Sequence, residues 1–158
     1  MIKIQATYLL TKLPNIKTTA SHEIKQAYLT DDAESLRVRK KGNTCYITRK
    51  IDMAGGSMEE LDMPILEKDF EAFWIRSTRN LANTRYYYSD TDGVNIRIDV
   101  FHDKLEGLAL AEVIFDSEEV KKEFKTPNWF GREISNEKWA SNQYFAGTTF
   151  EALKAKIG

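Results

Sequence analysis

Residues 35–50, SLRVRKKGNTCYITRK, carry the pattern that decides the predicted fold. Apolar and basic side chains alternate through the first half of this stretch, and alternation returns after the Lys-Gly-Asn triplet at residues 41–43. A period of two is typical of a strand with one buried face, and a glycine-containing turn between two such runs predicts a β-hairpin. Arg37 and Arg39 then share one strand face, opposite the leucine and the valine beside them.

Similar alternation predicts strands along most of the chain. Besides the two hairpin strands, Ser35–Lys40 and Thr44–Lys50, the predicted strands are Lys3–Leu10, His22–Thr30, Met58–Met63, Asn83–Ser89, Val94–His102 and Gly107–Phe115. An Asp92-Gly93 turn joins two of them. Roughly eight antiparallel strands with a few helices predict an α+β protein, most simply a closed or nearly closed barrel.

Three segments have helical signals. Leu66–Ile75 follows Pro64 and places four side chains on one helical face, Leu66, Phe70, Phe73 and Trp74. Ser117 is the predicted N-cap of Glu118–Phe124. Thr148 and Glu151 predict a capping box for a last helix that ends near Gly158.

Composition limits the classes of function. The 158 residues fit one domain spanning 1–158, with 42% hydrophobic and 30% charged residues. The net charge of −1 provides no global field for nucleic acid or an anionic membrane, so neither is expected as a partner. One cysteine, Cys45, excludes an internal disulfide, and with no leader or long apolar run the expected location is cytoplasmic. We expect Cys45 to be a packed thiol and His22 and His102 to be surface residues rather than ligands.

Charged side chains gather on one face of several predicted strands. The sets are Arg37 with Arg39, Lys50 with Tyr46 and Thr48, Glu60 with Asp62, Arg85 with Asn83, Arg97 with Asp99, and Glu112 with Leu110 and Ile114. Any set alone is more often a solvated surface. Because the opposite faces are apolar, packing those faces against helices would make the charged faces line the barrel interior. Basic and acidic groups held together suit a multiply charged phosphate with a divalent metal.

The order of motifs resembles the CYTH domain, the triphosphate tunnel metalloenzyme superfamily. The matching pieces are QAYL (26–29), LRVRKKG (36–42), CYITRK (45–50), EELDMPI (59–65), NTRYY (83–87), IDVF (98–101), GLALAEVIF (107–115), PNWFGREIS (127–135) and SNQYFA (141–146). The resemblance implies an eight-stranded antiparallel β-barrel whose tunnel binds a triphosphate with magnesium or manganese. Activities in this family include hydrolysis of inorganic tripolyphosphate, thiamine triphosphate or an RNA 5′-triphosphate, and cyclisation of ATP by adenylate cyclases.

The resemblance also assigns roles to residues. The expected anion-binding set is Arg37, Arg39, Lys50 and Arg85, extended by Lys3 and Arg97, with Tyr28 at a position that can close over the tunnel mouth. The expected metal-binding set is Glu60, Asp62 and Glu112. Some of the cations are expected to pair with carboxylates, including Asp99, rather than with a ligand. Family members are often dimers, which leaves a homodimer open.

The family's first-strand signature, Glu-x-Glu-x-Lys, reads Lys3, Gln5 and Thr7 in this chain. A lysine in place of a carboxylate also puts positive charge where a divalent cation would bind. Three further positions depart from the family pattern, Met58 for arginine, Asn83 for lysine and Ile114 for glutamate.

These six departures favour a protein that binds a phosphorylated or other small anionic ligand and whose triphosphate hydrolysis is weakened or lost, with Mg or Mn not required. The alternative is an active Mg- or Mn-dependent triphosphatase acting on inorganic tripolyphosphate or a nucleoside or thiamine triphosphate. A third hypothesis is a partner-binding domain that exposes Trp129, Phe130 and Trp139, although aromatics in a PNWFG turn more often pin a loop to a barrel edge.

Overall fold

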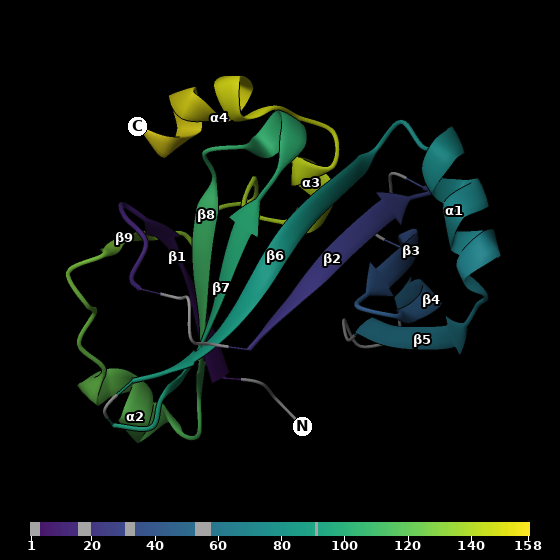
Figure 1. Cartoon of the computed structure of the whole chain (residues 1–158). Helices are drawn as coiled ribbons and strands as arrows, with labels where there is room; N and C mark the ends of the chain where they lie inside the picture. The colour runs from purple at the N-terminus through teal and green to yellow at the C-terminus, as the bar shows by residue number, and fades with distance from the viewer. Residues whose placement is uncertain (1–3, 16–19, 31–33, 53–57, 91) are drawn as a thin grey trace.

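The computed structural model describes residues 4–15, 20–30, 34–52, 58–90 and 92–158, with the side chains of residues 52 and 58 left out (Figure 1). Its strands form one antiparallel sheet in the order β5-β4-β3-β2-β6-β7-β8-β1-β9. Their bounds are β1 Ile4–Leu10, β2 Ser21–Tyr28, β3 Leu36–Lys41, β4 Thr44–Asp52, β5 Met58–Pro64, β6 Asn80–Ser89, β7 Asn95–Phe101, β8 Ala109–Phe115 and β9 Phe130–Glu133.

The hairpin of β3 and β4 forms as the sequence predicts. Arg37 lies opposite Thr48 and Arg39 opposite Tyr46. The turn contains Gly42 at φ +58°, a conformation that a residue without Cβ adopts readily. The hairpin fixes which side chains of β3 share a face with those of β4.

The predicted antiparallel sheet with flanking helices is confirmed, but it differs from the expected barrel in two respects. The described residues contain nine strands, and the hydrogen-bonded order leaves β5 and β9 as edges. Pro64, expected just ahead of a helix, instead ends the edge strand β5. Proline lacks the N–H that a central strand needs, so an edge is the position where it is tolerated.

Helix α1 (Glu67–Arg76) packs on one face of the sheet, beside β3 and β4. Phe70 is fully buried there among Ala27, Val38 and Cys45, with Trp74 partly buried against them. The predicted apolar face of this helix was wrong for two of its members. Leu66 precedes the helix in extended conformation and is 61% exposed, and Phe73 is 39% exposed.

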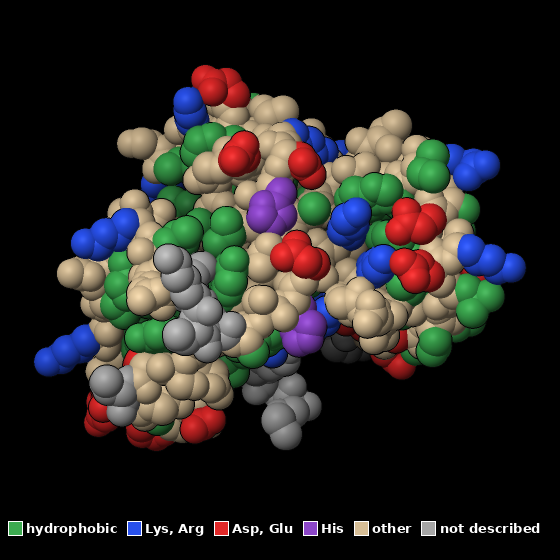
Figure 2. All heavy atoms as spheres, in the orientation of Figure 1, with side chains coloured by type: hydrophobic (Ala, Val, Ile, Leu, Met, Phe, Trp, Pro, Cys, Tyr) green, Lys and Arg blue, Asp and Glu red, His purple; other side chains and the backbone are tan. Residues whose placement is uncertain are grey.

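Exposed apolar side chains gather where α1 and β5 meet the surface. Figure 2 shows them there, interspersed with charged groups. The large ones are Leu61, Met63, Leu66, Phe73 and Ile75.

A second apolar cluster lies on the same face of the sheet, under α2 (Glu118–Glu123). It joins Ala6, Ile98 and Val113 to the neighbouring Trp129 and Phe130. These two aromatics are buried against strands, as the packed interpretation of the PNWFG turn predicts. Cys45 is likewise buried, as predicted.

The third cluster fills one end of the opposite face. Leu81, Phe101 and Leu110 pack there against Trp139 and Phe145. The covering elements are a 3-10 turn η1 (Asp103–Leu105), α3 (Asn142–Phe145) and α4 (Phe150–Ile157) (Figure 1). One end of this face is therefore closed by the C-terminal segment.

Helix caps confirm one sequence prediction and correct another. Ser117 accepts a hydrogen bond from the backbone N–H of Val120 and caps α2, as predicted. The cap of α4 is Thr149 rather than Thr148, because its hydroxyl accepts from the N–H of Ala152. Within the described ranges, no helix has the length and apolar character needed to cross a membrane.

Replacing Phe70 by alanine is expected to lower the free energy of unfolding by about 3–5 kcal/mol, because it deletes a fully buried ring and leaves a cavity. Ile75→Ala on the same helix is the matched control and should cost less than about 1 kcal/mol, since that side chain is 75% exposed. Urea denaturation followed by circular dichroism measures both. Equal losses would contradict the packing of α1.

Candidate functional site

The predicted anion-binding arginines share one face of the sheet. Arg37 and Arg39 lie on β3, Arg85 on β6 and Arg97 on β7. In the strand register Arg85 lies opposite Asp99, and Arg97 lies opposite Glu112. These side chains therefore lie on the side of the sheet that faces away from the apolar clusters beneath α1 and α2. We call this side, with Lys50, Glu60 and Asp62, the charged face. Alternation correctly predicted that these charged side chains share a face with their neighbours on each strand.

The most buried polar contact of the charged face joins Arg85 to Asp99. Arg85 Nε donates to Asp99 Oδ1 at 2.9 Å and Nη2 donates to Oδ2 at 3.1 Å. Asn83 Nδ2 also donates to Asp99 Oδ1 at 3.1 Å. The side chains are 10% and 12% exposed, so the two charges are largely desolvated and satisfy each other.

The pKa of Arg85 reflects this environment. Burial lowers it, but the hydrogen bonds and charge of Asp99 outweigh that effect, and the pKa lies above its usual value. Arg85 is therefore a fixed cation whose own counter-ion is built into the sheet.

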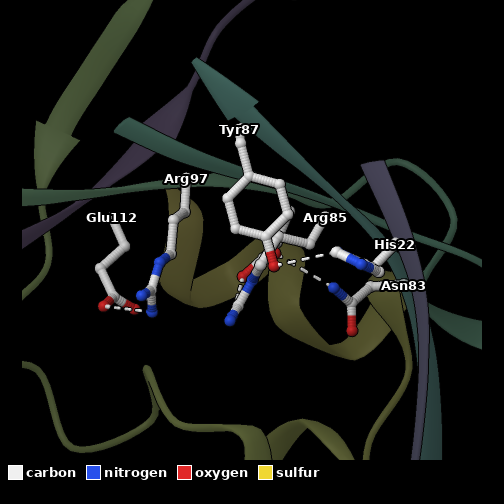
Figure 3. A network of polar contacts seen from close by, with 7 residues as sticks. His22, Asn83, Arg85, Tyr87, Arg97 and Glu112 are labelled. Atoms are coloured by element: carbon white, nitrogen blue, oxygen red, sulfur yellow. Dashed lines mark hydrogen bonds and ion pairs between the residues drawn. The ribbon is translucent and has the colours of Figure 1, made fainter. Parts of the chain in front are cut away.

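Arg97 and Glu112 form a looser pair on the neighbouring strands. Arg97 Nη1 lies 3.8 Å from Glu112 Oε1, and both side chains are about a quarter to a third exposed. Figure 3 shows the two side chains beside Arg85 and Tyr87. The pairs Arg97–Glu112 and Arg85–Asp99 agree with the prediction that some cations of this face pair with its carboxylates.

Arg37 and Arg39 differ from Arg85 because, within the described ranges, no carboxylate forms an ion pair with either. The Nε atoms of both are buried and have no hydrogen-bond partner among the described atoms. Burial lowers the pKa of Arg39, and the nearby charges of Arg85 and Arg37 lower it further, while Tyr46 opposes the shift. Guanidinium remains charged throughout the accessible pH range. Three neighbouring arginines with a single close carboxylate partner, Asp99, form a centre of positive charge.

A buried amide lies beside this centre. Gln26 on β2 is directly opposite Arg39 and is 1% exposed. Its Oε1 has no hydrogen-bond partner among the described atoms.

Sequence reasoning missed two residues of the charged face. Tyr87 lies two positions beyond Arg85 and opposite Arg97, and its hydroxyl is 3.2 Å from Nδ1 of His22 (Figure 3). His22 is exposed, as predicted, and lies opposite Arg85 on β2, so its exposed position is on the charged face. The alternation of β6 could have identified Tyr87, whereas His22 needed the non-local pairing of β2 with β6.

The remaining predicted residues are placed as follows. Tyr28 is 6% exposed and packs with Leu81 and Phe101 at the closed end, opposite Arg37 across β2 and β3. Gln5 and Thr7 point to the charged side of β1, because Thr7 pairs with Glu112. Lys3 and the side chain of Met58 lie outside the described residues.

The charged face fits a divalent metal poorly. Mg²⁺ in proteins is held by carboxylate oxygens with several waters. Among the residues described, no three or more His, Cys, Asp or Glu side chains converge as such a site, so Glu60, Asp62 and Glu112 are not a preformed trio. Glu60 and Asp62 lie on edge strand β5, where Thr48 donates to Asp62, and Glu112 lies on β8. A side of the sheet with fixed arginines and few free carboxylates is suited to binding an anion.

Comparisons with known proteins place this sheet in a family. No family model matches the sequence. An inorganic triphosphatase of Nitrosomonas europaea is 33% identical over 149 residues, which cover 92% of this chain and 97% of that protein. An inorganic triphosphatase of Acetivibrio thermocellus is 28% identical over 116 residues, 72% of each chain.

Solved structures agree with these relatives. The crystal structure of an inorganic triphosphatase matches with a TM-score of 0.81 and 30% identity, covering 94% of this chain and 96% of the other. A protein from Bacillus halodurans, at 15% identity and a TM-score of 0.51, covers 87% of this chain and shares the fold alone. The chain belongs to the CYTH family, close to the bacterial inorganic triphosphatases.

Proposed function

We propose that this chain binds inorganic triphosphate on the charged face and hydrolyses it to phosphate and diphosphate. The observation that carries the proposal is the pair of arginines, Arg37 and Arg39, whose buried Nε atoms have no hydrogen-bond partner among the described residues and which lie near the charge of Arg85. The two related proteins are named inorganic triphosphatases, which supports hydrolysis over binding alone. The single cysteine, which excludes an internal disulfide, supports a cytoplasmic location for this activity.

The arrangement suits the electrostatics of phosphoryl transfer. Guanidinium groups donate paired N–H groups to phosphate oxygens, and donors fixed in a low-dielectric site lose little energy in reorganising as charge shifts. Water attacks the terminal phosphorus, the bond to the bridging oxygen breaks, and diphosphate leaves. Phosphoryl transfer depends mainly on positioning of the substrate and stabilisation of its charge. We therefore assign substrate binding to Arg37, Arg39 and Arg85.

A second candidate function is binding of the same anion with weakened or lost turnover. The observation that favours it is the first strand, where neutral Thr7 lies opposite Glu112 and neutral Gln5 lies opposite Ile114. Since the described residues fit a divalent metal poorly, no step of the reaction is assigned to one.

A phosphate-release assay separates the two functions. With inorganic triphosphate, assayed in EDTA and separately with Mg²⁺ or Mn²⁺, we expect release well above a heat-denatured control in at least one buffer, and less release from ATP or thiamine triphosphate. Absence of release from all three, together with binding of inorganic triphosphate in calorimetry, would replace the first function with the second. Absence of both would remove the charged face as a triphosphate site.

Arg39→Ala is expected to weaken binding of inorganic triphosphate about 10- to 100-fold, because it removes charge-assisted hydrogen bonds worth about 1.5–3 kcal/mol. Arg49→Ala is the matched control. Arg49 belongs to strand β4 but, by register with Leu36, points to the opposite face, so its loss should change affinity less than about threefold. Isothermal titration calorimetry provides the dissociation constants. A similar loss for both variants would point to general charge rather than to the site.

A further inference from the structure

We infer that the charged face takes triphosphate as the metal-free polyanion, with arginines supplying the positive charge that a bound divalent cation would otherwise supply. The inference rests on the proposed function and deepens it, because it specifies the form of the ligand. It rests on two observations about the described residues. The carboxylates of the charged face are paired with other side chains or lie apart, and two of its arginines have no carboxylate partner.

Asp99 is already committed. Its two carboxylate oxygens accept three hydrogen bonds, two from Arg85 and one from Asn83. A metal ion at Asp99 would have to displace a bidentate guanidinium from a pair that is largely buried, and would leave that cation without its partner. Asp99 therefore serves as the counter-ion of Arg85 and holds its guanidinium in place.

Glu112 has the wrong neighbours for a divalent site. On one side, Thr7 of β1 offers a neutral hydroxyl, and on the other Arg97 of β7 brings a positive charge to 3.8 Å. The charge of Glu112 also acts on Arg85 and contributes to raising the pKa of that arginine. A divalent cation placed here would gain one carboxylate and be repelled by two guanidinium groups.

The other two carboxylates of the predicted metal-binding set are far from Glu112 in the strand order. Glu60 and Asp62 lie on β5, and β4, β3, β2, β6 and β7 separate that strand from β8 in the hydrogen-bonded order. Thr48 donates to Asp62, and Glu60 faces Lys50 across the strand pair. Glu60 and Asp62 therefore lie near the cation Lys50 and do not form a metal site together with Glu112.

The arginines have the opposite property. Arg37 and Arg39 are held in the sheet without a carboxylate ion pair among described residues, and their mutual repulsion with Arg85 is relieved when an anion binds. Mg²⁺ bound to free triphosphate occupies the same oxygens that these guanidinium groups would bind. Excess Mg²⁺ should thus compete with the protein for the ligand.

Calorimetry with inorganic triphosphate tests this directly. In buffer with EDTA we expect binding at least about threefold tighter than binding with excess Mg²⁺, because Mg²⁺ competes for the oxygens of triphosphate. Binding that needs Mg²⁺, with affinity in EDTA at least about tenfold weaker, would overturn the metal-free form while leaving the proposed function intact. No binding in either buffer would overturn both.

Glu112→Gln gives a second test that does not depend on activity. If Glu112 is a counter-ion, removing its charge frees Arg97, and affinity for triphosphate in EDTA should rise about two- to fivefold. If Glu112 were a metal ligand, affinity in EDTA would stay constant and any gain from Mg²⁺ would disappear. Glu119→Gln, an exposed residue of α2, is the matched control and should change neither value. Thermal unfolding of each variant checks that the fold is retained.

Discussion

The bidentate pair of Arg85 and Asp99 is the contact on which the charged face depends. A guanidinium buried in a sheet must be compensated, and here a carboxylate on the adjacent strand provides that compensation at hydrogen-bonding distance. Once Arg85 is fixed, it repels the neighbouring Arg39 and leaves that cation ready for an external anion. A single internal pair therefore organises the remaining positive charge.

This arrangement follows from strand alternation. The neighbours of Arg37 and Arg97 on the opposite face, Val38 and Ile98, are apolar and lie in the clusters beneath α1 and α2, so a shift of one residue in register would bury these arginines under those helices. Burial of Ala27, Val38 and Ile98 sets the register, and the register sets the geometry of the site. Stability and ligand binding are thus coupled through the same strands.

The sequence predicted the local features and missed those that depend on distant pairing. The hairpin around Gly42 and the face shared by Arg37 and Arg39 follow from adjacent residues. The four-residue strand β9 was missed because it is too short for periodicity to reveal, and its pairing with β1 joins residues far apart in the chain. Thr148 has the capping-box spacing to Glu151, but the adjacent Thr149 accepts the hydrogen bond from Ala152, and neighbouring residues of the same chemistry are not separated by pattern alone.

The site shows the same division. Charge on alternating positions identified the arginines, but which carboxylate belongs to which cation depends on the register of β6 with β7 and of β7 with β8. That register also separates the neutral residues of β1 from the arginines to which the proposed function assigns anion binding. Gln5 and Thr7 border the end of the face that holds Glu112, whereas Arg37 and Arg39 lie on β3, with β2, β6, β7 and β8 between them and β1. Neutral residues on β1 therefore leave the positions of Arg37 and Arg39 on β3 unchanged, as the proposed function requires.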